Sequence, residues 1–264
     1  MNILRKSLSV ILLGSLACAA QAEVKTITPD VLKVGMDITY PPFESFDGDK
    51  VVGSDPDFAS DLAKQLGLKA DFVNTEFAGL ILGLKSNHFD TVISGMYITP
   101  ERTAQALAIP YARTGAAIMT KAGAAKEPKV PEDLCGLKVG LQRGTTWVAK
   151  LQKLSADYCV AQGKGAIAVS EFPSAPEATQ AMLAGNVDAQ MEIGGAASQI
   201  VERSRGRVRI TSPELVYKET LGIYLRKDNE ALKQALEEAF AKVRASGDYA
   251  ALLKKYNLED VPAN

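Results

Sequence analysis

Residues 89–102 read FDTVISGMYITPER and carry the three parts of one α/β unit. Residues 89–93 are apolar or β-branched apart from one aspartate, as expected of a buried strand. Gly95 then leaves the backbone open, and Thr99 stands where its side chain can cap a helix that begins at Pro100. The stretch therefore predicts a strand, an open loop and a helix, in that order.

The same alternation continues on both sides of this stretch. Helices predicted over residues 55–66 and 231–246 carry apolar side chains three or four positions apart, and each stops before a glycine. Strands are predicted over residues 31–34, 70–73, 89–93, 137–141, 166–169 and 187–191. Repeated strand-helix units predict an α/β fold with mainly parallel sheets.

Two short patterns recur about a hundred residues apart. The letters LKVG occur at residues 32–35 and again at 137–140, and the helix-turn-strand pattern of residues 84–90 returns at 183–188. The chain of 264 residues is also longer than one core comfortably supports. Both observations favour two α/β lobes of about a hundred residues each.

The first 22 residues have the pattern of a secretory signal peptide. Arg5 and Lys6 precede an apolar run, and Ala20 and Ala22 form a small-residue cleavage pattern, which predicts export to the periplasm with cleavage after Ala22. The apolar run is shorter than the ~20 residues of a membrane span. A lipid anchor at Cys18 is the weaker alternative, because Ser rather than an aliphatic residue stands three positions before it.

Charge and cysteine content narrow the class of partner and cofactor. With 30 Lys and Arg against 31 Asp and Glu, the chain has no excess of positive charge to attract nucleic acid. Cys135 and Cys159 follow the signal segment, and an even count in an exported protein favours a disulfide. A metal site is the alternative, but a lone His88 and the absence of a Cys-x-x-Cys pattern leave it without ligands, and we expect no cofactor.

Candidate binding residues follow the predicted strands, because parallel α/β folds place their ligand loops at the carboxyl ends of strands. Residues 37–44, DITYPPFE, offer an aromatic ring and two carboxylates on a loop that two prolines stiffen. A helix start with free N–H groups and hydroxyls binds anions, and a guanidinium holds a carboxylate with two hydrogen bonds. Arg102 with Thr145 and Thr146 would make such a site, although each alone is also common as a solvated helix residue or an ordinary helix start.

Five segments together resemble family 3 of the bacterial extracellular solute-binding proteins, the polar amino-acid group. They are residues 40–44, 53–66, 89–102, 134–146 and 222–258, and the most specific of them is ISGMYITPER at 93–102. The resemblance implies a two-lobed periplasmic binding protein of type II, with a two-strand hinge and a ligand cleft between the lobes. It places lobe 1 at residues 23–115 and 219–264, lobe 2 at residues 116–218, and the crossing strands near 113–117 and 213–221.

The resemblance also implies a set of ligand contacts. An aromatic side chain, here Tyr40, packs on the ligand. Arg102, the Gly-Thr helix start at Thr145 and Thr146, and the backbone before the arginine hold the α-carboxylate. The predicted ligand-binding residues are Asp37, Tyr40, Phe77, Ser94, Gly95, Met96, Tyr97, Arg102, Gln142, Thr145, Thr146 and Glu192. Of these, Asp37 and Gln142 are expected near the ligand side chain, and Phe77 is expected as one wall.

Two departures from the family pattern bear on the ligand. Where family members commonly have the Asp that pairs with the ligand ammonium, this chain has Ile193, and the nearest acid is Glu192, one position earlier. A shift of one residue in a strand turns a side chain to the opposite face, so Glu192 replaces that Asp only if residues 193–195 bend the backbone. Tyr97 stands where a small hydroxyl residue is usual. These departures argue against a free α-amino acid and favour a substituted amine, an opine-like conjugate or another carboxylate.

The predicted function is that of a non-enzymatic, monomeric receptor, which binds a small molecule by its carboxylate, closes by hinge motion and delivers it to the membrane permease of an ABC importer. Two alternatives remain on the same fold: a periplasmic enzyme resembling the dehydratases of cyclic acids, and a ligand sensor for signalling. No nucleophile-base pair is visible in the sequence to favour the enzyme.

Overall fold

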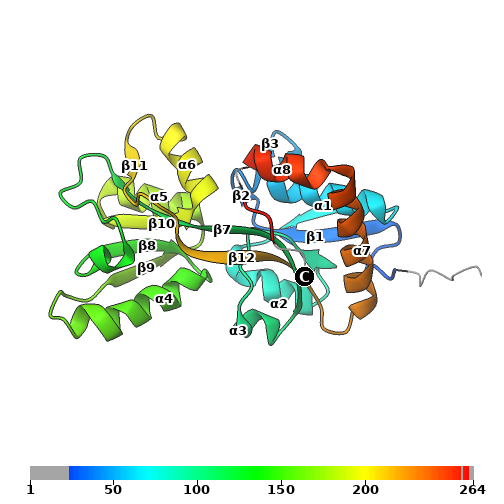
Figure 1. Cartoon of the computed structure of the whole chain (residues 1–264), viewed down its shortest axis with the longest axis horizontal. Helices are drawn as coiled ribbons and strands as arrows, with labels where there is room; N and C mark the ends of the chain where they lie inside the picture. Colours follow the sequence, from blue (N-terminus) through cyan, green and yellow to red (C-terminus); the bar gives the residue numbers. More distant parts are fainter. Residues whose placement is uncertain (1–23, 257, 262–264) are drawn as a thin grey trace, which may run out of the picture.

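The computed structural model describes residues 24–256 and 258–261. The predicted signal peptide and its cleavage site lie outside this range. The protein has two lobes, side by side, joined by two long strands that run between them (Figure 1). These strands are β7 (Leu107–Lys121) and β12 (Val216–Leu225).

Lobe 1 holds the elements from both ends of the chain. Its strands are β1 (Val31–Met36), β5 (Lys69–Asn74) and β6 (Thr91–Val92), with a small separate sheet of β2 (Thr39–Tyr40), β3 (Glu44–Asp47) and β4 (Lys50–Val52). Its helices are α1 (Ser54–Gln65), α2 (Leu80–Lys85), α3 (Pro100–Thr103), α7 (Glu230–Ser246) and α8 (Asp248–Tyr256).

Lobe 2 holds the middle of the chain. Its strands are β8 (Lys138–Gln142), β9 (Ala168–Phe172), β10 (Ala189–Ile193) and β11 (Val208–Ile210). Its helices are α4 (Thr146–Leu154), α5 (Ala175–Ala184) and α6 (Gly194–Arg203).

One sheet of nine strands continues through both lobes. Its order is β5-β1-β6-β12-β7-β10-β8-β9, with β11 added beside β7. Pairs inside each lobe are parallel, whereas β12 and β7 pair antiparallel with each other and with their neighbours. The predicted α/β class is confirmed, and the predicted crossing segments lie in or beside β7 and β12. The exact lobe boundaries near residues 115 and 218 stay a prediction.

The apolar side chains that recur along α1 and α7 pack against each other and against β7 in the core of lobe 1. Phe58 of α1 is fully buried and packs edge-on against Phe240 of α7, with ring centroids 5.1 Å apart. The same Phe58 ring stacks on Tyr111 of β7 at 5.3 Å. Gly247 ends α7 in the left-handed conformation at φ +88°, where a side chain would be strained. The two terminal helices are thereby fixed against the sheet that carries the cleft.

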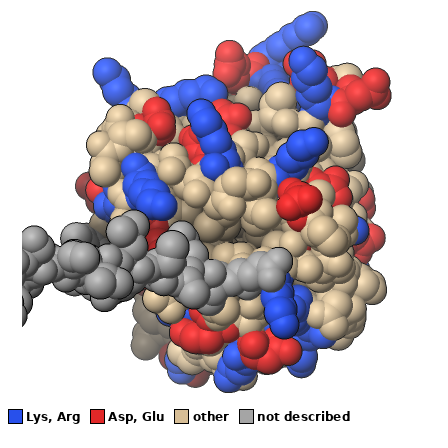
Figure 2. Space-filling view, turned by 90° about the vertical axis from the view of Figure 1, so that its right-hand side faces the viewer, with Lys and Arg blue, Asp and Glu red and all other residues tan. Residues whose placement is uncertain are grey.

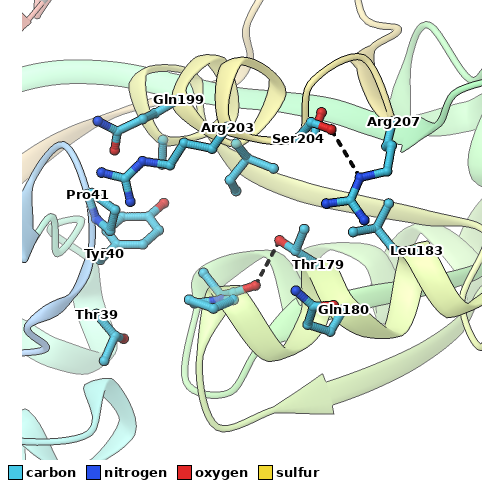
Figure 3. A pocket seen from close by; sticks show the side chains of 14 residues that line it. Thr39, Tyr40, Pro41, Thr179, Gln180, Leu183, Gln199, Arg203, Ser204 and Arg207 are labelled. Atoms are coloured by element: carbon cyan, nitrogen blue, oxygen red, sulfur yellow. Dashed lines mark hydrogen bonds between the residues drawn. The ribbon is translucent and has the colours of Figure 1, made fainter.

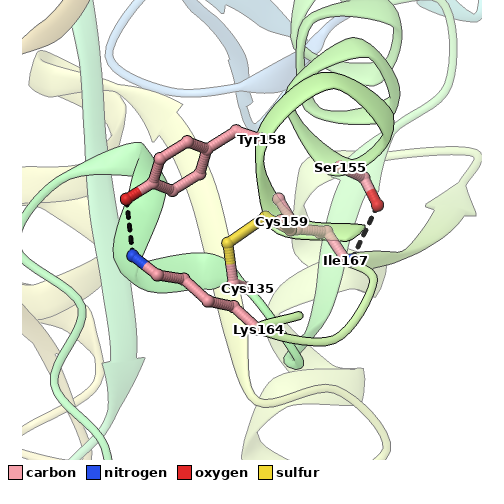
Figure 4. The surroundings of a disulfide bond; sticks show 6 residues. All are labelled: Cys135, Ser155, Tyr158, Cys159, Lys164 and Ile167. Carbon is pink, nitrogen blue, oxygen red and sulfur yellow. Dashed lines mark hydrogen bonds between the residues drawn. A yellow bond between two sulfur atoms is a disulfide. The ribbon is translucent and has the colours of Figure 1, made fainter. Parts of the chain in front are cut away.

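A disulfide closes lobe 2 away from the cleft. Cys135 and Cys159 are bonded, with their Cα atoms 5.3 Å apart, which confirms the predicted pair (Figure 4). Cys159 lies in Ser155–Val160, a stretch that continues α4. Nearby, Ser155 Oγ accepts a hydrogen bond of 2.9 Å from the Ile167 backbone N–H. The bridge therefore ties the end of the α4 segment to the chain that leads into β8.

The outer face of lobe 1 has no dominant sign of charge. Figure 2 shows lysine and arginine side chains interspersed with aspartate and glutamate over the visible part of this face. Within residues 24–256 and 258–261, the structure contains no helix that is long and apolar enough to cross a membrane.

Candidate ligand-binding site

The carboxyl ends of strands from both lobes meet at the boundary between them. β1, β6, β8 and β10 all end there, and their loops enclose a narrow cavity of about 20 Å³. The cavity is lined by Tyr40, Phe77, Gly95, Tyr97, Arg102, Gln142, Thr145, Thr146, Trp147 and Ile193. Eight of these ten are residues that the sequence predicts as ligand contacts.

Arg102 spans the boundary between the lobes. Thr99 caps the short helix α3 as predicted, because its Oγ1 accepts a hydrogen bond from the Arg102 backbone N–H at 3.3 Å. One guanidinium nitrogen of Arg102 donates to the Tyr97 carbonyl oxygen within lobe 1 at 2.6 Å, and the other donates to the Gly144 carbonyl oxygen of lobe 2 at 2.9 Å. The Phe77 ring lies beneath it, 5.5 Å from guanidinium carbon to ring centroid. This cation is held in place by contacts to both lobes.

Two buried polar atoms beside Arg102 have no hydrogen-bond partner in the described part of the chain. They are the Tyr97 hydroxyl and the Trp147 indole nitrogen, on side chains only 3% and 2% exposed. Their rings meet edge-on across the lobe boundary at 6.0 Å. A buried polar group without a partner costs roughly 1–3 kcal/mol, so these atoms favour a polar ligand atom between them.

The loop after β6 separates the predicted residues around Gly95 into two groups. Gly95 and Tyr97 line the cavity, whereas Ser94 and Met96 point into lobe 1. Met96 was predicted as a ligand contact, but it packs in a core cluster with Tyr224 and does not line the cavity. Gly95 has φ +52°, a conformation that favours glycine.

A pair of buried carboxylates supports the Ser94–Gly95 backbone from behind. Ser94 Oγ donates to Glu44 Oε1 at 2.6 Å, and the Gly95 N–H donates to Asp55 Oδ2 at 2.6 Å. Burial raises the pKa of Asp55 to about 6. Burial and the charge of Asp55 raise the pKa of Glu44 well above its usual range. The Gly95 N–H is thus used inside lobe 1, so the predicted backbone grip on a ligand carboxylate lacks this donor.

Asp37 links the lobes beside the cavity but does not line it. Its Oδ2 accepts hydrogen bonds from the Gln142 side-chain amide of lobe 2 at 2.7 Å and from the Phe77 backbone N–H at 3.1 Å. Burial raises the pKa of this carboxyl, and the hydrogen bonds from Thr39, Phe77 and Gln142 oppose that shift. Its position next to Gln142 and Phe77 makes it a support for two lining residues.

Glu192 lies behind the lining for the reason that strand geometry predicts. Ile193, its neighbour on β10, faces the cavity, and side chains alternate along a strand, so Glu192 faces the other way. The strand continues regularly to Ile193, and α6 begins directly after it at Gly194. Glu192 accepts hydrogen bonds from the Tyr40 hydroxyl and the Gln190 amide, both at 2.8 Å. Burial raises its pKa to about 7. Both carboxylate oxygens are therefore engaged, and the arrangement does not support a direct contact from Glu192 to a ligand.

Sequence reasoning missed Trp147 as a lining residue. Thr145 is the N-cap of α4, and its Oγ1 donates to the Gln142 carbonyl oxygen at 2.8 Å, so the predicted helix start is present. Trp147 is the second residue of that helix and projects toward Tyr97. Its position in the first turn of a helix whose start was predicted to bind the ligand could have indicated Trp147 as a lining residue.

Comparisons with known proteins show similarity to amino-acid-binding proteins. The L-cystine-binding protein TcyJ of Escherichia coli strain K12 is 32% identical over 233 residues, which cover 87% of this chain and 84% of that protein. The solved structure of an ancestral arginine-binding protein bound to arginine has a TM-score of 0.78 at 34% identity, covering 86% of this chain and 98% of that one.

A third similar protein connects the fold to an enzyme. The ancestral amino acid-binding protein AncCDT-1, described as a precursor of cyclohexadienyl dehydratase, has a TM-score of 0.73 at 31% identity, covering 86% of this chain and 95% of that one. The family model for bacterial extracellular solute-binding proteins, family 3, matches residues 32–259. The predicted resemblance is confirmed: the chain belongs to family 3 of the bacterial extracellular solute-binding proteins.

Proposed function

We propose that this protein is the substrate-binding component of an ABC importer and binds an amino acid or an amino-acid derivative by its carboxylate. In this proposal it is exported to the periplasm, cleaved after Ala22, and delivers its ligand as a monomer to a membrane permease. The observation that carries the proposal is the reach of Arg102 from lobe 1 to the helix start of lobe 2. The named ligands of TcyJ and of the ancestral arginine-binding protein support an amino-acid-like ligand.

The lining favours a ligand that carries a carboxylate but no free ammonium group. Among the ten described lining residues, Arg102 is the one with a formal charge. The Trp147 N–H and the Tyr97 hydroxyl add two donors for the same anion. Ile193 occupies the place where a carboxylate would neutralise an ammonium, and desolvating an unpaired cation there is costly. We therefore infer an N-acylated amino acid, because its amide nitrogen carries no charge.

Binding is proposed to proceed by opening and closing of the lobes. The cavity of about 20 Å³ holds roughly one water molecule, so an amino acid enters only when the lobes separate. A ligand carboxylate would then take the place of the Gly144 carbonyl on Arg102 and contact both lobes. Contacts made to both lobes at once are what stabilise the closed arrangement.

Matched ligand pairs test the ligand class. Arginine and glutamine are each compared with their Nα-acetyl forms in a thermal-shift assay, alongside cystine and any small molecule that mass spectrometry finds copurified. A true ligand at 100 times its dissociation constant adds about 2.7 kcal/mol to the free energy of unfolding. We expect stabilisation by an N-substituted form. Stabilisation by the free amino acid alone would contradict the inference that the ligand lacks a free ammonium group.

Arginine variants test the carboxylate contact itself. Arg102→Gln is expected to weaken binding of the identified ligand by roughly a hundredfold, because it removes a charge-assisted pair of hydrogen bonds. Arg143→Gln is the matched control, since Arg143 is exposed, lies next to Gly144 and does not line the cavity. Equal affinities of the two variants in calorimetry would remove the basis for the proposal.

A second candidate is an enzyme acting on a cyclic acid. It is favoured by the likeness to AncCDT-1 and by the raised pKa of Glu192, about 7, which suits a general acid or base. The enzyme is the weaker candidate, because Glu192 does not line the cavity and both of its oxygens accept hydrogen bonds from the protein. Mass spectrometry of the ligand after incubation with the protein separates the two functions: a new product supports the enzyme, and unchanged ligand supports the receptor.

A further inference from the structure

A second cavity, of about 210 Å³, lies outside the ligand cleft. It is formed by helices α5 and α6 of lobe 2 and by the Tyr40–Pro41 turn of lobe 1 (Figure 3). Tyr40 is the one residue that lines both this cavity and the cleft among the described residues, so its ring forms part of the wall between them. By the same measure of volume, this cavity is about ten times larger than the cleft cavity.

The floor of this cavity is apolar and its two ends are cationic. Leu183 and Ile200 contribute aliphatic surface between the helices. Arg203 extends over the Tyr40–Pro41 turn at one end, and Arg207 hangs over Leu183 at the other (Figure 3). The described lining contains no Asp or Glu. The cavity therefore combines an apolar body with a local charge of two positive side chains.

Neither arginine of this cavity has a carboxylate partner among the described residues. Arg209 forms an ion pair with Glu127, whereas no carboxylate of a described residue lies within ion-pair distance of Arg203 or Arg207. Arg207 Nε donates to the Ser204 carbonyl oxygen at 3.1 Å, which orients its guanidinium and leaves the terminal nitrogens for another acceptor. Gln199, also in the lining, has a buried Oε1 with no donor among the described residues. Arg203 and Arg207 are exposed to solvent, so their terminal guanidinium nitrogens are free to bind an anion that enters the cavity.

We propose that this cavity is a second ligand site, separate from the cleft, which binds a small organic carboxylate through Arg203 and Arg207 and covers its carbon chain with Leu183 and Ile200. The cations supply charge-assisted hydrogen bonds to the carboxylate, and the aliphatic floor supplies the burial that most small-molecule sites depend on.

Occupation of this site stabilises the closed arrangement of the lobes. Its lining residues Thr39, Tyr40 and Pro41 belong to lobe 1, and the helices α5 and α6 belong to lobe 2. A ligand that contacts both lobes binds more tightly when the lobes are together. It therefore raises the affinity of the cleft for the cleft ligand, and the cleft ligand raises the affinity of the second site by the same factor. The site thus links the concentration of a second metabolite to uptake.

Hexanoate is the probe, with 1-hexanol and hexylamine as matched neutral and cationic controls. Binding is followed by the methyl resonances of Thr179 and Ile200 at the second site and of Thr145 in the cleft. The titration is run on the full protein and on Arg102→Gln, which disables the proposed carboxylate contact of the cleft. We expect saturable shifts at Thr179 and Ile200 in both proteins, with hexanoate binding at least roughly tenfold more tightly than either control.

Three glutamine variants locate the anion. Arg203→Gln and Arg207→Gln are each expected to weaken hexanoate binding by roughly tenfold, the factor typical of a charged hydrogen bond. Arg205→Gln is the matched control, because Arg205 is an exposed cation between them in sequence that does not line the cavity. Equal binding of hexanoate and 1-hexanol, equal loss in all three variants, or shifts confined to Thr145 and abolished by Arg102→Gln would each overturn the proposal. The last result would leave the cleft as the carboxylate site.

Discussion

Three residues of the cleft carry hydrogen-bond donors that could bind the ligand anion, and they come from different lobes. Arg102 and Tyr97 come from lobe 1, and Trp147 comes from the first turn of α4 in lobe 2. Tyr97 and Trp147 each bury a polar atom without a partner in the described chain. We therefore propose that the Trp147 indole N–H contacts the ligand anion.

Trp147→Phe tests that role, because it keeps an aromatic ring and removes the indole N–H. The variant is expected to bind the identified ligand roughly tenfold more weakly in calorimetry, the loss of one hydrogen bond to a charged group. Trp147 is also the single tryptophan of the sequence, so ligand binding is expected to change the fluorescence of the wild-type protein. A ligand that binds Trp147→Phe as tightly as the wild type would show that the indole nitrogen makes no contact.

The sequence predicted the lining residues better than their orientation. Tyr40, Arg102 and Thr145 were predictable, because a resemblance aligns positions along the chain and helix caps have local signals. Ser94 and Glu192 were predicted as ligand contacts, but their side chains hydrogen-bond Glu44 and Tyr40 and do not line the cavity. For Glu192 the alternation of the strand already indicated the opposite face. The orientation of Ser94 follows from a contact to a distant carboxylate, which the sequence of one segment does not specify.

At the scale of elements, β10 carries a buried acid that couples the stability of the fold to pH. Glu192 hydrogen-bonds Tyr40 of lobe 1 from a strand of lobe 2, and burial raises its pKa to about 7. Asp55 in α1 has its pKa raised to about 6, also by burial. For both groups the folded pKa lies above the unfolded value of about 4. Their stabilising contribution is complete below about pH 4 and is lost as the pH rises through 6 and 7.

The free energy of unfolding is therefore expected to fall between about pH 4 and pH 7. Glu192→Gln keeps a hydrogen-bond acceptor for Tyr40 and removes the titration, so its decrease over this range should be smaller, by on the order of 2 kcal/mol. Urea unfolding at several pH values measures both slopes. Parallel curves for the two proteins would show that Glu192 is not the titrating group.

The disulfide is expected to stabilise lobe 2. Cys135 and Cys159 are separated by 24 residues, and closing a loop of this length stabilises a protein by about 3 kcal/mol in the chain-entropy model. The double variant Cys135→Ser with Cys159→Ser should unfold at a correspondingly lower urea concentration but keep its ligand affinity, because the bridge lies away from the cleft. An unchanged unfolding midpoint would contradict the stabilising role.

Most elements were predictable within a few residues, and the exceptions have a common cause. The strand predicted over residues 89–93 is only Thr91–Val92, because the chain turns at Ser94 to meet the carboxylates of β3 and α1. The helices of residues 55–66 and 231–246 were closer, since their periodicity and terminal glycines are local signals. Contacts to distant parts of the chain set the ends of the short strands.

In the whole molecule, the two lobes form opposite walls of one cleft and are joined by β7 and β12 (Figure 1). The contacts across the boundary include Arg102 with Gly144 and Asp37 with Gln142. The recurrence of short patterns at a spacing of about a hundred residues predicted the two lobes. The identity of the contacts between them was not predictable, because it depends on how two independently folded surfaces meet.

The central claim is that lobe 1 and lobe 2 hold the same ligand carboxylate. Its most direct test is a double-mutant cycle in calorimetry on the identified ligand, with Arg102→Gln in lobe 1, Thr145→Val at the helix start of lobe 2, and the two combined. The losses of binding free energy are expected to be non-additive, with an interaction energy of about 1 kcal/mol or more, as for residues that share a partner. Additive losses would contradict the claim, because the two side chains would then act on the ligand independently.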